Sequence, residues 1–170
     1  MTPTKYSKPT IYLHWFSAIA IAVAWVIGKL MGDLDNSDAK LLLIGIHIAL
    51  GTFVFIFTAL RIFYTFKNPR PEMIQTGSAF HNFLIPFIYY LMIVIIIMIT
   101  ISGTITLFSK SLGPAILSGN YLLLPPIGFN IYHYFHELLS NLFALLLIFH
   151  IAGITLHFLR KKENLLHRIS

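Results

Sequence analysis

The sequence predicts an all-α protein, a four-helix bundle that spans a membrane. The chain is 57% hydrophobic and only 11% charged over its 170 residues, whereas a soluble protein has about a quarter of its residues charged. Its apolar residues gather in four stretches, at residues 10–31, 41–66, 80–108 and 131–159. Each stretch reaches the length of about 20 residues that a helix needs to cross the hydrocarbon core. We therefore expect a single transmembrane domain over residues 1–170.

The connections between the stretches support this architecture, because two of the three are short, as in an up-and-down bundle. The first, at residues 32–40, carries three aspartates, and the second, at 67–79, carries two prolines, which would stop a helix. The third, at residues 109–130, is longer and contains three prolines and three glycines. It also contains an apolar run at 121–124, so we expect it to fold back over the mouth of the bundle.

The distribution of basic residues predicts the orientation. Nine of the twelve lysines and arginines fall at the amino terminus, around the second connection or at the carboxyl terminus. These nine are Lys5, Lys8, Arg61, Lys67, Arg70, Arg160, Lys161, Lys162 and Arg168. Cytoplasmic loops are the ones enriched in Lys and Arg, so both termini are expected in the cytoplasm. The basic face would contact membrane lipid, and nucleic-acid binding is not expected.

The start of the chain allows a second interpretation. Lys5 and Lys8, the apolar run after them and Ala22-Val23-Ala24 resemble a signal peptide with its cleavage site. However, the apolar run continues past that site to Met31. The longer run favours a retained first span.

Four histidines lie inside the predicted spans, where an ionisable side chain is costly and marks a functional site by default. His14 is in the first span, His47 in the second, and His136 and His150 are both in the last. The last two are 14 residues apart, which is about four helical turns. Their rings therefore leave the same face of one helix, roughly 21 Å apart along its axis.

The topology then selects the partners of these two residues. His14 falls in the inner half of the membrane with His150, and His47 falls in the outer half with His136. Two opposed neutral imidazoles are suited to bind one haem iron axially, so the two pairs predict two b-type haems with all four histidines as iron ligands. Gly51, one turn after His47, would leave room for a porphyrin. For a single histidine the alternative is an interhelical hydrogen bond.

Other metal and cofactor chemistry is less well supported. The chain has no cysteine, which excludes disulfides, thiolate metal sites and covalently attached c-type haem. Zinc requires its ligands at one place, whereas these histidines are divided between two depths.

Further polar residues share the faces of the histidines. His157 lies seven residues after the inner ligand of the last span; it could donate a hydrogen bond to a quinone or extend toward lipid headgroups. Arg61, at the inner end of the second span, could pair with haem propionates or with lipid phosphate. The roles of His81 and His133 stay open, and Glu137 could orient a ring or a water molecule.

Several motifs give the chain a family resemblance. In the first two spans they are Tyr12-Leu13-His14-Trp15, Gly45-Ile46-His47 with Gly51, and Arg61. In the last span the motif is Phe135-His136-Glu137-Leu138-Leu139-Ser140-Asn141-Leu142, followed by His150 and His157. The span ends in the basic segment Arg160-Lys161-Lys162-Glu163-Asn164. Over essentially the whole chain they resemble the bacterial cytochrome b561 family of di-haem quinone oxidoreductases. The resemblance implies b-type haems on the two histidine pairs, a location in the bacterial inner membrane, and His157 as a catalytic residue beside ubiquinone.

Within this family, the activity that the resemblance implies is superoxide oxidase, which passes an electron from periplasmic superoxide through both haems to ubiquinone. We expect this function, with superoxide or another periplasmic donor as a partner, and a monomer or homodimer. One alternative is a cytochrome b subunit that carries electrons for, and anchors, a larger dehydrogenase or hydrogenase complex. The other is a haem-free transporter or channel whose histidines line a pore.

Overall fold

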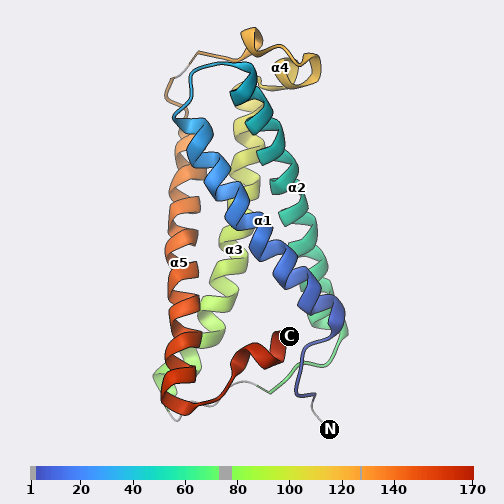
Figure 1. Ribbon diagram of the computed structural model, residues 1–170, viewed down its shortest axis with the longest axis vertical. Helices are drawn as coiled ribbons and strands as arrows, with labels where there is room; N and C mark the ends of the chain where they lie inside the picture. Colours follow the sequence, from blue (N-terminus) through green and yellow to red (C-terminus); the bar gives the residue numbers. More distant parts are fainter. Residues whose placement is uncertain (1–2, 73–77, 127) are drawn as a thin grey trace.

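The computed structural model describes residues 3–72, 78–126 and 128–170 and shows a helical bundle (Figure 1). Four helices are long and apolar enough to cross a membrane: α1 (Lys8–Gly32), α2 (Asp38–Lys67), α3 (Ala79–Ser109) and α5 (Ile131–Lys161). The shorter elements are α4 (Gly113–Ser118), η1 (Tyr121–Leu123) and η2 (Leu165–Ile169), and the described residues include no strand. The all-α fold and four apolar helices of membrane-spanning length are confirmed, and each helix extends slightly beyond its apolar stretch.

The four long helices form two pairs. α1 packs mainly along α2, and α3 packs mainly along α5, while α2 meets α3 over a smaller area. Both chain termini lie at one end of the bundle, and α4 lies at the other (Figure 1). We refer to these as the terminal end and the cap end.

Polar residues set the helix boundaries that matter for the site. The side chain of Ser37 accepts a hydrogen bond from the backbone N–H of Lys40 at the start of α2, and that of Asn130 accepts one from His133 at the start of α5. Such N-caps satisfy backbone donors that have no partner within the helix. α5 ends at Lys162, whose φ of 60° is the left-handed conformation that commonly closes a helix. The chain therefore turns back toward the bundle at this residue.

An apolar cluster fills the middle of the bundle and joins the two helix pairs. Its buried members are Val54 of α2, Ile95 and Ile96 of α3, and Phe143 of α5. Ala20 and Ile21 of α1 pack against them. Large apolar side chains also cover the outer surface of the helices, as expected for residues that face lipid.

The long third connection folds over the cap end, as its apolar composition predicted. Leu41 and Ile44 of α2 form a buried cluster with Ala115 of α4 and with Leu124. The side-chain amide of Asn36 also donates a hydrogen bond of 3.2 Å to the carbonyl of Pro125, which ties the first connection to the third.

The C-terminal segment, residues 163–170, folds back across the terminal end. The indole N–H of Trp15 donates to the Ile169 carbonyl at 2.8 Å, and the backbone N–H of Tyr6 donates to the Arg168 carbonyl at 3.0 Å. The Arg168 guanidinium donates to the backbone carbonyl of Glu72 at 2.6 Å. Through these contacts the segment joins α1, the amino terminus and the connection between α2 and α3.

Candidate functional site

The structure brings His47 of α2 and His136 of α5 together near the cap end. Their ring centroids are 5.9 Å apart, with an angle of 77° between the ring planes. A metal ion bound by an imidazole nitrogen on each side, with bonds of about 2 Å, separates two ring centres by about 6 Å. The observed separation fits one iron between the two rings.

Hydrogen bonds fix the orientation of both rings. Nδ1 of His47 lies 2.9 Å from the Ala24 carbonyl of α1, and Nδ1 of His136 lies 2.9 Å from the Ile99 carbonyl of α3. A carbonyl accepts only, so each Nδ1 carries the proton that it donates. The lone pair is then on Nε2, which is the arrangement found in metal-bound histidines. Each of these two histidines is thus oriented by the other helix of its own pair.

Two glycines make room for these rings. A Cβ at Gly103 would lie 3.0 Å from Cε1 of His136, and a Cβ at Gly28 would lie 3.3 Å from Cε1 of His47. Each glycine comes one turn after the carbonyl that the corresponding ring contacts. The sequence analysis did not identify either glycine. The signal that could have found them is a glycine inside a predicted span, where the missing side chain can make room for a neighbouring group. At Gly51, the glycine that we expected to matter, a Cβ would meet nothing within 4 Å.

A small cavity of about 70 Å³ lies beside the pair. Its lining includes His47, Gly51, His136, Ser140 and Phe143. Sites for drug-sized ligands occupy about 300–1,000 Å³, so this cavity by itself is smaller than a porphyrin.

A second cluster lies toward the terminal end, around Arg61 of α2. A guanidinium nitrogen of Arg61 is 3.4 Å from Nδ1 of His14, and the guanidinium carbon lies 5.9 Å from the centre of the Tyr89 ring. His150 is close enough to interact electrostatically with both His14 and Arg61. Among the four histidines, in the described part of the chain, only His47 and His136 have their rings in contact. The terminal-end cluster therefore combines two imidazoles with a cation.

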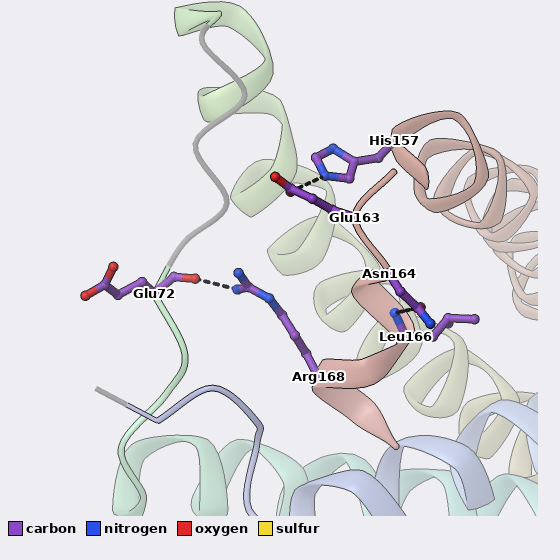
Figure 2. Close-up of polar contacts among 6 residues, drawn as sticks. All are labelled: Glu72, His157, Glu163, Asn164, Leu166 and Arg168. Carbon is purple, nitrogen blue, oxygen red and sulfur yellow. Dashed lines mark hydrogen bonds and ion pairs between the residues drawn. The ribbon is translucent and has the colours of Figure 1, made fainter. Parts of the chain in front are cut away.

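His157 lies closer still to the terminal end. Its Nε2 is 2.9 Å from Oε2 of Glu163, which follows the end of α5 (Figure 2). The His157 side chain is 13% exposed and the Glu163 side chain is 64% exposed. A nearly buried imidazole is thereby connected to the surface by a carboxylate.

Two further candidates are His81 and Glu137. His81 is exposed and makes an edge contact with Phe80, with ring centroids 5.8 Å apart. Glu137, which could have oriented a ring or a water molecule, pairs with Lys29 at 2.8 Å. No three His, Asp or Glu side chains among the described residues are grouped so that they could hold a metal ion together. The histidines of interest occur as pairs.

Comparison with known proteins gives one match. A family model described as prokaryotic cytochrome b561 matches residues 5–170, which is nearly the whole chain. No curated protein and no solved structure matches the chain. The family match agrees with the resemblance carried by the sequence motifs.

Proposed function

Because the chain belongs to the prokaryotic cytochrome b561 family of membrane electron-transfer proteins, we propose that it holds two haem b groups in one domain over residues 1–170. His47 and His136 would be the iron ligands at the cap end, and His14 and His150 those at the terminal end. The observation that carries the proposal is the 5.9 Å separation of the His47 and His136 rings, each oriented through Nδ1.

Haem b supplies one-electron redox chemistry when it is bound, and the protein adjusts its potential through ligands, charge and burial. The carbonyls of Ala24 and Ile99 hold the cap-end rings in the tautomer that presents Nε2. Arg61 would pair with a haem propionate at the terminal end, because its positive charge lies beside His14. The central apolar cluster, which includes Phe143, keeps water out of the region between the two levels.

We place the terminal end in the cytoplasm and the protein in the bacterial inner membrane, following the positive-inside rule. Superoxide is the proposed donor on the outer side and gives up one electron to become dioxygen. Ubiquinone is the proposed acceptor at the terminal end, where it takes two electrons and two protons. His157 would contact the quinone and manage its protons.

The charge of the outer face favours a second candidate function. Three lysines and four carboxylates lie at the cap end, which would be the outer face, and one of these lysines, Lys29, is already paired with the carboxylate of Glu137. Burial lowers the pKa of Lys110, with a smaller contribution from Lys40. An anionic substrate is normally attracted by an excess of positive charge, which this face lacks. This feature suits a cytochrome b subunit that receives electrons from a dehydrogenase or hydrogenase partner.

Optical spectroscopy on the purified protein tests the haem proposal. A dithionite-reduced-minus-oxidised spectrum with pyridine-haemochrome quantitation should give two b haems per chain. Each of His14→Ala, His47→Ala, His136→Ala and His150→Ala should reduce this number to one. Absence of haem, or a haem content unaffected by His136→Ala, would contradict the proposal and favour a haem-free channel.

The donor is tested with the same preparation. Enzymatically generated superoxide should reduce the haems of the isolated protein, and added ubiquinone analogue should reoxidise them. Haems that accept electrons from quinol but not from superoxide would instead favour the subunit of a larger complex.

A further inference from the structure

The contact between His157 and Glu163 joins a nearly buried imidazole to an exposed carboxylate at the terminal end. Figure 2 shows the Glu163 side chain directed at the ring, with 2.9 Å between Oε2 and Nε2. A carboxylate that is 64% exposed is in direct contact with water, whereas an imidazole that is 13% exposed has little such contact. The pair therefore has the geometry of a proton relay.

The chain holds Glu163 in this position from both sides. Before it, Lys162 takes the left-handed conformation that ends α5 and turns the chain back toward the bundle. After it, the Asn164 side chain accepts a hydrogen bond from the backbone N–H of Leu166 at 3.1 Å. Further on, Arg168 binds the backbone carbonyl of Glu72 (Figure 2). The position of Glu163 is thus set by several contacts.

The charge distribution makes this placement unusual. Only six of the 170 residues are carboxylates, and Glu72 and Glu163 are the two at the terminal end. A carboxylate just beyond the C-terminus of a helix faces the negative end of the helix dipole. Helix stability therefore does not explain why Glu163 lies here.

We propose that Glu163 supplies protons to His157 for quinone reduction. This inference rests on the proposed function, in which one quinone takes two electrons, one at a time, and two protons. For each proton, the Glu163 carboxylate takes it from the aqueous phase and passes it to Nε2 of His157. The ring then releases its other proton, from Nδ1, to a quinone oxygen, which leaves the ring protonated at Nε2. Before the second transfer, proton exchange with water returns the ring to the tautomer with Nδ1 protonated and Nε2 free. Water is the source of both protons, so the reduction to quinol balances.

Rapid mixing measures the effect of removing the carboxylate. The full-length protein, reduced with a stoichiometric amount of dithionite under anaerobic conditions, is mixed with a ubiquinone analogue, and haem reoxidation is followed by absorbance. Glu163→Gln should slow the maximal rate by at least about tenfold, since acid–base groups contribute about 10²–10⁴-fold. The quinone concentration at half-maximal rate should stay the same. Glu163→Asp should restore much of the rate.

Two control variants separate proton supply from a structural role. Glu72→Gln removes the other terminal-end carboxylate, which meets the C-terminal segment through its backbone carbonyl, and should react like the wild type. Arg168→Gln loosens the segment but keeps Glu163, so it should not reproduce the defect. Added formate, a small carboxylic acid, should partly restore the rate of Glu163→Ala.

A spectroscopic measurement examines the contact without relying on turnover. The measurement is 15N NMR of the dithionite-reduced protein labelled with 15N-histidine. The Nε2 resonance of His157 is assigned as the one that disappears in His157→Gln, and Glu163→Gln should shift it. Glu72→Gln should leave this resonance in place. A His157 resonance that does not respond to Glu163→Gln would contradict the contact itself.

The kinetic outcomes distinguish this inference from the proposed function. If Glu163→Gln reacts as fast as the wild type while His157→Gln is slow, Glu163 is not the proton donor, although the proposed function stands. If Arg168→Gln is as slow as Glu163→Gln and formate restores nothing, the role of Glu163 is structural and the inference is wrong. If the wild-type haems are not oxidised by the quinone analogue at all, both proposals fail.

Discussion

The substitution Gly103→Ala tests whether the position of the His136 ring depends on the missing side chain opposite it. A Cβ at residue 103 would lie 3.0 Å from Cε1 and 3.1 Å from Nδ1 of His136, whereas carbon atoms in favourable contact are about 3.5–4.0 Å apart. The ring must therefore move by about half an ångström. This movement lengthens the 2.9 Å hydrogen bond from Nδ1 to the Ile99 carbonyl.

The expected loss is mainly in haem affinity. Removing a hydrogen bond that orients a metal-bound histidine costs about 10–100-fold in metal affinity, so the affinity for the cap-end haem should fall by that factor in Gly103→Ala. The free energy of unfolding should change less. Overpacking costs about 1–3 kcal/mol, and alanine is favoured over glycine in a helix by about 1 kcal/mol.

The assay is haem content per chain after exchange into haem-free detergent, measured as the pyridine haemochrome. Gly103→Ala should fall from two haems toward one. Gly28→Ala should lose less, because its Cβ would lie 3.3 Å from the His47 ring, and Gly153→Ala, with nothing within 4 Å, should keep both haems. Two tightly held haems and an unchanged spectrum in Gly103→Ala would refute the reasoning.

Three further predictions concern charge and ionisation. Arg61→Leu removes a cation 3.4 Å from His14. Because a nearby positive charge favours the reduced haem, the midpoint potential of the haem proposed at His14 should fall by roughly 60 mV, which is a tenfold change in the equilibrium constant for one electron. Redox titration measures this potential. Lys29→Gln breaks an exposed ion pair with Glu137, so thermal melting should show a loss below about 1 kcal/mol that vanishes in high salt. Burial raises the pKa of Tyr6, so its contribution to stability is complete below about pH 10 and is lost as the pH rises through the folded-state value. Alkaline melting curves of Tyr6→Phe should lack this decline. An unchanged potential, a loss independent of salt, or identical alkaline curves would contradict the respective prediction.

The helices could be predicted from the sequence because each of them is marked by a long apolar stretch. Each span is longer than the stretch of about 20 residues that is needed to cross the hydrocarbon core, and the helices begin and end within three residues of the predicted limits. The return of the third connection was also predictable. Leu124 and the apolar residues before it are stabilised by burial, and Leu41 and Ile44 at the start of α2 bury Leu124.

Other parts of the site depend on contacts that a linear pattern does not reveal. The role of Gly103 follows only when α3 is known to lie against α5, because its effect is on a ring from that other helix. Similarly, the contact between Trp15 and the Ile169 carbonyl joins residues 154 positions apart. Glu163 stands in a basic run that we interpreted as a topology signal and as part of a family motif, without a role for Glu163 itself. Its proximity to His157 required the turn at Lys162 to be seen.

The arrangement of the helices suggests why two haems would behave independently in this bundle. Both proposed pairs use a histidine of α5, and their partners, His47 and His14, come from the α1–α2 pair, so each haem would connect the two helix pairs. Between the two levels lies the apolar cluster around Phe143, which joins α2, α3 and α5 without any histidine. Loss of one haem would therefore leave the packing that supports the other. Because a ligand that binds only the folded state stabilises it, each haem would add separately to the association of the two helix pairs.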